Sequence, residues 1–171
     1  MKAIIFTGTP GTGKTTLAKK LAKKLDFFYL DVNKLISKNK LFQGYDKKRK
    51  TKIVDVDILN DVLIKEILLI KKNKKISGVI IDLHLSHYIP YRYVDLCIVT
   101  KCDIRELSKR LKKKRFHKEK IKENIQAEIF DICYNEALER KHDVLVANTT
   151  NQKNLTALLS KLKQNLKNST L

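Results

Sequence analysis

Residues 8–15 of this sequence read Gly8-Thr9-Pro10-Gly11-Thr12-Gly13-Lys14-Thr15. They follow a short apolar run at 3–7 and open a segment, 14–25, whose leucines and alanines recur at helical spacing. The glycines let the backbone curl until its N–H groups converge on an anion, and the positive end of the next helix adds to that field. The pattern G-x-x-x-x-G-K-[ST] between a strand and a helix therefore predicts a phosphate-binding loop (P-loop).

Strands and helices are predicted to alternate along the rest of the 171 residues. Apolar runs predict strands at 27–30, 78–82, 95–100 and 143–147. Helical periodicity predicts helices at 57–72, 103–115, 118–140 and 152–166. A polar, lysine-rich stretch at 37–52 is predicted to hold a loop and a short helix. Such alternation is typical of an α/β fold with a parallel sheet, here in one domain without a linker or an internal repeat.

Composition excludes several classes of protein. The chain is 43% hydrophobic, enough for a core, yet it has no run of about 18 apolar residues that could span a membrane. The apolar stretch at 3–7 is too short for a signal peptide. The three cysteines, Cys97, Cys102 and Cys133, form no CxxC motif and are predicted to be reduced core thiols of a cytoplasmic protein, with Cys102 the one that could be exposed.

The charge is strongly basic. Lysine and arginine number 37 against 18 acidic residues, which gives a net charge of +19. A field of this size attracts polyanions such as RNA and nucleotides. Lysine greatly outnumbers arginine, however, and arginine is the usual residue for bidentate phosphate recognition. A genome-wide codon bias is therefore the alternative explanation of the charge.

Further candidate residues follow the apolar run at 78–82. That run ends in Asp82, where P-loop proteins carry a carboxylate that orients Mg²⁺. Lys14 is predicted to reach the β- and γ-phosphates, and the Thr15 hydroxyl to hold Mg²⁺. His84 and His87 come next, but no further ligand pair is close in the sequence, which argues against a zinc site. We predict that His84 orients water or the transferring phosphoryl group, with a structural histidine bonded to its loop as the alternative.

The chain resembles the isoenzyme-six (CINAP-type) branch of the adenylate kinases over nearly its full length. The resemblance rests on the order and spacing of Gly8–Thr16, Gly44-Tyr45-Asp46, Ile53-Val54-Asp55-Val56-Asp57, Asp82-x-His84 and Asn124-Ile125-Gln126-x-Glu128-Ile129. It implies a P-loop NTPase fold with a five-stranded parallel sheet flanked by helices. It also implies a nucleoside monophosphate (NMP) binding region near 31–54 and a short lid near 113–123, within a single domain over 1–171.

The same resemblance implies an adenylate kinase that transfers the γ-phosphate of ATP to AMP, has ATPase side activity and uses Mg²⁺ with ATP. It further implies a part in small ribosomal subunit maturation, through a platform ribosomal protein or pre-rRNA. One alternative is an ATP-switched assembly factor whose kinase activity is incidental. Another is a shikimate- or nucleoside-type kinase, because a fold does not determine its substrate.

Residue roles also follow from the resemblance. The residues implied to bind the ATP phosphates are Gly11, Gly13, Lys14, Thr15 and Thr16, with Asp82 serving Mg²⁺ and His84 the attacking group. The Arg-Gly pair of the family lid falls on Lys114 and Arg115, and Gln152 is the nearest match for an adenine contact. Arg49 and Arg92 are the candidates for holding the acceptor phosphate, with a solvated surface charge as the alternative for each, because exposed arginine is common. Ordinary adenylate kinases have a Gly-x-Pro-Arg loop where this chain has Asp82-Leu83-His84, so we also predict water-directed ATPase activity.

Overall fold

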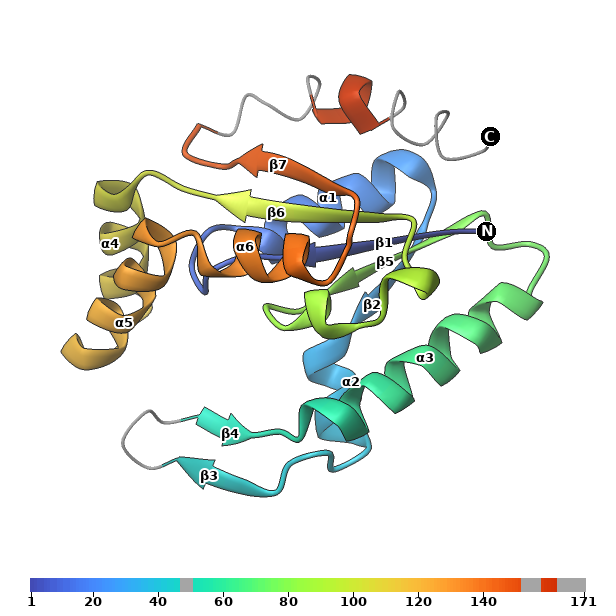
Figure 1. Ribbon diagram of the computed structural model, residues 1–171, viewed down its shortest axis with the longest axis horizontal. Coiled ribbons are helices and arrows are strands. Elements are labelled where there is room, and N and C mark those ends of the chain that lie inside the picture. The colour runs from blue at the N-terminus through green and yellow to red at the C-terminus, as the bar shows by residue number, and fades with distance from the viewer. Residues whose placement is uncertain (47–50, 152–157, 163–171) are drawn as a thin grey trace.

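The computed structural model describes residues 1–46, 51–151 and 158–162 of the chain (Figure 1). Its strands are β1 (Lys2–Thr7), β2 (Phe28–Asp31), β3 (Gly44–Asp46), β4 (Thr51–Ile53), β5 (Gly78–Asp82), β6 (Leu96–Lys101) and β7 (Val144–Asn148). Its helices are α1 (Lys14–Leu25), α2 (Val32–Lys38), α3 (Val56–Lys72), α4 (Ile104–Lys113), α5 (Lys118–Ile129) and α6 (Ile132–Glu139), with short 3-10 helices η1 (Ser86–Tyr88) and η2 (Tyr91–Tyr93).

The main sheet has five parallel strands in the order β2-β5-β1-β6-β7. β1 lies at its centre, and β5 is buried along its whole length, as strands covered on both faces are. One core layer packs α2, α3 and α6 against the sheet, and the other packs α1 and the helical residues 158–162 (Figure 1). The predicted five-stranded parallel sheet flanked by helices is confirmed.

This strand order positions the phosphate loop. β1 and β5 are neighbours, with Phe6 paired to Asp82, so both strands end at the same edge of the sheet. In open parallel sheets, ligands bind outside the carboxyl ends of the strands, where the order of the strands reverses direction. The loop at 8–15 and Asp82 are therefore brought together there by the backbone alone.

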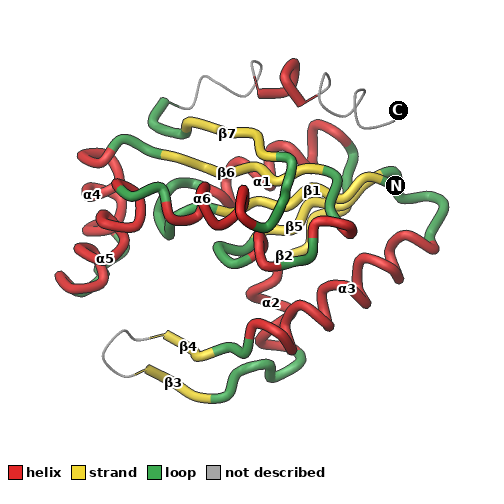
Figure 2. The backbone as a smooth tube through the Cα atoms, in the orientation of Figure 1, coloured by secondary structure: helices red, strands yellow, loops and turns green. Residues whose placement is uncertain are grey.

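The stretch at 37–52 differs from its prediction of a loop and a short helix. Its helix, α2, begins earlier and ends at Lys38, and β3 pairs with β4 as an antiparallel hairpin. This hairpin extends away from the main sheet between α2 and α3 (Figure 2). Each of its strands is only three residues long. Strands this short carry too little alternation for a periodicity pattern to detect.

The predicted single helix at 118–140 is wrong. The structure has two helices, α5 and α6, because Asp131 adopts a left-handed conformation with φ 54°. The break turns Ile129 outward, where it is 57% exposed, although the predicted helix placed it inward; Ala137 is fully buried. Asp131 also forms an ion pair with Lys101 at the end of β6. Periodicity cannot reveal such a break, since the apolar spacing continues through it.

Cys102 corrects another expectation, because it is buried. It packs with Leu107 and Leu111 under α4. Cys97 is also buried, and Cys133 is partly buried; all three thiols are free. The helix predicted at 152–166 is described only at 158–162, which is helical, with Leu158 and Leu162 buried. Within the described ranges, no helix has the length and apolar character needed to cross a membrane.

Candidate nucleotide-binding site

An open cavity of about 1060 Å³ lies at the carboxyl edge of the sheet. Its walls come from the loop at 8–15, the start of α1, the end of β5, one side of α4 and the segment around the end of β7. Eight of the predicted site residues line it: Gly11, Gly13, Lys14, Thr15, Thr16, Asp82, His84 and Lys114. Residues predicted from three separate parts of the sequence therefore share one cavity.

The phosphate loop has the backbone that its glycines predicted. Gly8, Gly11 and Gly13 have φ values of 129°, 98° and 91°, a region that side chains disfavour. Gly8 also lies so close to β6 that a Cβ there would be 2.4 Å from the carbonyl oxygen of Thr100. Gly13 caps α1 without a side-chain hydrogen bond, so the first N–H groups of α1 face the loop unmasked. This is the arrangement that binds an anion.

Lys14 is buried among the carbonyl oxygens of the loop. Its Nζ donates to the carbonyl oxygens of Gly8 at 2.6 Å and Thr9 at 2.9 Å. Burial lowers the pKa of Lys14 to about 8, although Cys133 and Asp82 partly oppose the shift. Lys14 also lines the cavity, so its ammonium can turn from these carbonyls to a phosphate bound in the loop.

Asp82 is held by a side chain that the sequence did not indicate. The carboxylate is 3% exposed, and its Oδ2 accepts a hydrogen bond from the Tyr29 hydroxyl at 2.8 Å. Burial and this bond raise the pKa of Tyr29. Thr15 and Asp82 offer oxygen ligands to the same cavity, and Mg²⁺ needs only one or two of these besides water and phosphate oxygens. The residues present thus fit a magnesium ion that arrives with a nucleotide.

His84 and His87 lie in different surroundings. His84 is exposed at the cavity wall, where the protein packed around it, and then the charge of Lys14, lower its pKa to about 4. A neutral imidazole at this place can accept a proton from water or orient an attacking oxygen. His87 is buried and does not line the cavity.

The basic wall of the cavity comes from α4. Lys109, Lys113 and Lys114 line it, but Arg115 does not. Arg110, which sequence reasoning did not assign to the site, also lines it and donates from Nη2 to the carbonyl oxygen of Thr149 at 2.9 Å. Thr149 in turn donates from its hydroxyl to the carbonyl oxygen of Thr12 in the phosphate loop. Arg110 is four residues before Lys114, and this helical spacing was the signal that could have revealed it.

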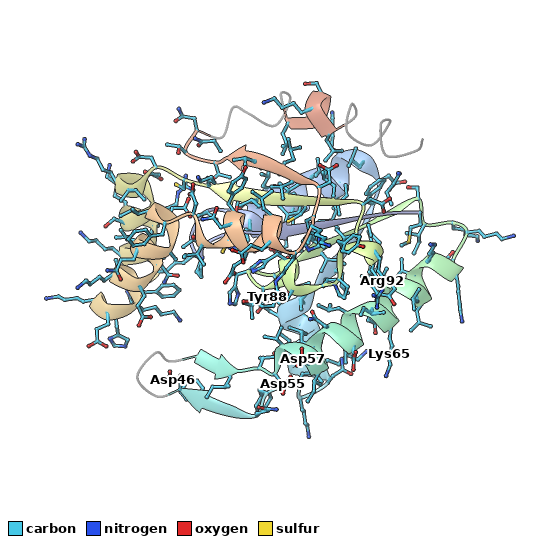
Figure 3. All side chains as sticks on the ribbon, in the orientation of Figure 1. Asp46, Asp55, Asp57, Lys65, Tyr88 and Arg92 are labelled. Atoms are coloured by element: carbon cyan, nitrogen blue, oxygen red, sulfur yellow. The ribbon has the colours of Figure 1, made fainter. Side chains whose placement is uncertain are left out.

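Of the other predicted residues, Arg92 does not line the cavity. Arg49 and Gln152 lie outside the described residues. Arg92 is exposed on η2, before the start of β6, with its guanidinium 5.0 Å from the ring centre of Tyr93. In the view of Figure 3, Arg92 lies on the side opposite α4 and α5. Its role as an acceptor-phosphate ligand stays a prediction.

Other motifs behind the resemblance have structural roles. Glu128 is buried, and its Oε1 accepts from the backbone N–H of Cys102 at 2.8 Å, which ties α5 to the end of β6. Asp55 caps α3 by accepting from the N–H groups of Asp57 and Ile58, and the bond from Ile58 contributes most to lowering its pKa. Glu128 thus joins two elements, and Asp55 fixes the start of α3.

The fold and the cavity together define a P-loop nucleotide-binding domain. Residues 4–131 match a protein-family model described as an AAA domain. The chain is 40% identical over 137 residues to the adenylate kinase isoenzyme 6 homolog FAP7 of Saccharomyces cerevisiae, an alignment covering 80% of this chain and 66% of that protein. It is 32% identical over 143 residues to the adenylate kinase isoenzyme 6 homolog of Caenorhabditis elegans, covering 84% of this chain and 76% of the relative.

An archaeal relative gives the same result. The chain is 37% identical over 145 residues to a putative adenylate kinase of Methanosarcina acetivorans, covering 85% of this chain and 76% of that protein. The chain belongs to the adenylate kinase isoenzyme 6 family. A solved structure of deoxyadenosine kinase from M. mycoides with bound dATP aligns with a TM-score of 0.58 at 15% identity, over 95% of this chain and 100% of that one, and confirms the fold.

Proposed function

We propose that this protein is an adenylate kinase that transfers the γ-phosphate of ATP to AMP. The observation that carries the proposal is the convergence of Lys14, Asp82 and the lysines of α4 on one cavity beside the phosphate loop. Relatives at 37–40% identity are named as adenylate kinases or putative adenylate kinases, which supports the same reaction here.

Phosphoryl transfer asks the protein mainly to align two oxygens and to neutralise the charge of the transferring group. Lys14, the N-terminus of α1 and the lysines of α4 supply positive charge around the phosphates. Thr15 and Asp82 would hold Mg²⁺, which, when bound, adds further positive charge at the β- and γ-phosphates. Lys114 would act from the lid, which we assign to about 113–123, together with Arg115.

The acceptor AMP is assigned to the region at about 31–54, which includes α2 and the β3–β4 hairpin. Asn33 of α2 lines the cavity, so this region borders the same cavity as the phosphate loop. Arg49 and Arg92 are the proposed ligands of the acceptor phosphate, and Gln152 is the proposed contact of the adenine of ATP.

We include an ATPase side activity in the proposal. His84 lies in the cavity as a neutral imidazole, where it can orient a water molecule toward the γ-phosphate when the acceptor is absent. The proposal also includes a cytoplasmic location, where the three free thiols would stay reduced.

The test is ³¹P NMR of the protein with Mg²⁺ and ATP, with and without AMP, which follows ADP and inorganic phosphate separately. A kinase forms two ADP for each AMP consumed, with little free phosphate. His84→Asn should reduce the release of phosphate more than the transfer to AMP, and Lys14→Met should abolish both. Lys19→Met on the exposed face of α1 is the control and should change neither. Release of inorganic phosphate at the same rate as ADP formation, unchanged by AMP, would contradict the proposed kinase activity.

A second candidate function is an ATP-switched assembly factor of the small ribosomal subunit, with a platform ribosomal protein or pre-rRNA as its partner. The net charge of +19 favours it, because such a field attracts RNA. It also makes RNA a better partner than a basic protein, unless the protein meets local acids such as Asp46, Asp55 and Asp57, which lie on and beside the hairpin (Figure 3).

A further inference from the structure

His87 has no part in the proposed function, although it belongs to the histidine pair that follows Asp82. It lies on η1 and is 1% exposed. Its Nδ1 is 2.5 Å from the hydroxyl oxygen of Thr7, and its Nε2 is 2.7 Å from Oε2 of Glu136 on α6. One imidazole ring therefore connects the end of β1 to α6.

Thr7 carries this connection to the site. It is fully buried, it is the last residue of β1, and it directly precedes the phosphate loop. Its hydroxyl donates to the carbonyl oxygen of His84 at 2.8 Å. The neighbouring Ser86 donates to the carbonyl oxygen of Phe6 at 2.6 Å. These two hydrogen bonds therefore attach the loop that bears His84 to Phe6 and Thr7, the last two residues of β1.

The hydrogen atoms in this chain of contacts can be counted. The Thr7 hydroxyl has one hydrogen, and its bond to the His84 carbonyl uses it. The Thr7 oxygen can then only accept from His87, so Nδ1 is the donor in this arrangement. The contact of Nε2 with Glu136 needs a second proton, which the imidazole and the carboxylate hold between them. A ring with its proton on Nε2 alone would take the Thr7 hydrogen instead and release the His84 carbonyl. The protonated Nδ1 of His87 is therefore what lets Thr7 hold His84.

We propose that His87 is a positioning residue of this site. Through the Thr7 hydroxyl it holds the His84 carbonyl, and with it the His84 ring, at a set distance from the phosphate loop, while Glu136 braces it against α6. The inference rests on the proposed function, in which His84 orients a water molecule toward the γ-phosphate. His87 itself touches no reacting atom, so its removal should affect the chemical step more than the binding of nucleotide.

Two substitutions of His87 distinguish the roles of its two ring nitrogens. Asn places its amide group near the position of Nδ1, whereas Gln places it near that of Nε2. His87→Gln keeps a hydrogen-bond partner for Glu136 but loses the contact with Thr7. We expect its kcat for ATP hydrolysis to fall by about ten- to a hundredfold, because small misplacements of reacting groups have effects of this size. Its KM for ATP should change by less than about threefold, since the phosphate loop remains intact. His87→Asn keeps a donor for Thr7 and should recover most of kcat.

Thr7→Val removes the hydroxyl while nearly conserving volume. It should lower kcat as much as His87→Gln does, and the double variant should be no worse than either single one, because both break the same chain of contacts. Tyr88→Phe is the matched control. The Tyr88 hydroxyl contacts the same Glu136 carboxylate at 3.4 Å but does not reach Thr7, so this variant should keep the wild-type kcat.

Thermal unfolding of each variant separates positioning from stability. A folded His87→Gln protein with the kcat of the wild type would overturn the proposal, as would additive effects of Thr7→Val and His87→Gln. If His87→Gln does not fold, Thr7→Val carries the same test. The imidazole ¹⁵N signals of His87 give a readout independent of turnover: Thr7→Val should shift the Nδ1 signal, and an unchanged signal would overturn the proposal. A wild-type protein with no transferase or ATPase activity would instead refute the proposed function and leave the ¹⁵N result to judge His87.

Discussion

Tyr29 and Asp82 meet through a single hydrogen bond across neighbouring strands, and this bond orients the buried carboxylate. Tyr29→Phe removes only that hydroxyl. Hydrogen bonds to charged groups contribute about 1.5–3 kcal/mol, so we expect a loss of about that size in the free energy of unfolding in urea. The variant should also need more Mg²⁺ for half-maximal turnover, because Asp82 loses its set orientation.

The control for this prediction is Lys19→Met, which removes the cation lying 5.5 Å from the centre of the Tyr29 ring and leaves the Asp82 bond in place. An unchanged Mg²⁺ requirement in Tyr29→Phe would show that Asp82 is held by other contacts.

We expect His142 to make the stability of the fold depend on pH. It is buried, its Nε2 donates to the carbonyl oxygen of His87 at 2.9 Å, and its Nδ1 has no hydrogen-bond partner among the described residues. Burial lowers its pKa below the ordinary value of 6.5. As the pH falls through 6.5, the unfolded chain therefore takes up the proton before the folded protein does. Stability should fall between about pH 7 and pH 5 for this reason.

His142→Gln keeps a donor for the His87 carbonyl and cannot be protonated. Urea unfolding at several pH values should show a shallower loss of stability in acid than in the wild type. His117→Gln, at an exposed position before α5, is the control and should leave the slope unchanged. Equal slopes for wild type and His142→Gln would assign the acid sensitivity to other groups.

At the scale of elements, the turn between α5 and α6 depends on one residue. Asp131 has φ 54°, a conformation that costs about 1–2 kcal/mol for most residues but less for Asn and Asp. Asp131→Val should thus lower the free energy of unfolding by about 1–2 kcal/mol, besides losing the ion pair with Lys101. Asp131→Asn should lose only the ion pair, at most about 1 kcal/mol. Equal losses in urea unfolding would mean that the ion pair, rather than the backbone conformation, supports the turn.

At the scale of the whole molecule, the charge of +19 predicts a salt-dependent affinity for RNA. Each phosphate that a protein neutralises releases counterions, so binding of a labelled single-stranded RNA should weaken by at least about tenfold between roughly 50 and 200 mM salt. Fluorescence anisotropy measures this affinity at each salt concentration.

Lys118→Gln with Lys122→Gln on the exposed side of α5 should reduce the salt dependence, whereas Lys71→Gln with Lys72→Gln at the end of α3 is the charge-matched control. An RNA affinity that does not change with salt concentration would contradict RNA binding through the lysines. It would favour a codon bias as the origin of the charge.

Much of the fold and half of the site were accessible from local patterns. The strand at 78–82 has its predicted bounds, the helix at 57–72 is one residue longer at its start, and the phosphate loop with Asp82 lies where its spacing indicated. These features depend on residues close together in the chain: an apolar run, a helical period, glycines at set intervals. The hairpin could not be predicted, because its strands are short. The break at Asp131 could not be predicted either, because the turn there leaves the apolar spacing unchanged.

The remaining site residues depend on contacts between distant parts of the chain. Tyr29 is 53 residues from Asp82, Arg110 is 39 from Thr149, and Thr7 is 80 from His87. No spacing within a segment encodes which of these side chains meet, since that depends on the order of the strands and on the helices packed over them. The residues that bind phosphate therefore follow from one short stretch of sequence. The side chains that orient the site residues depend instead on the packing of the folded chain.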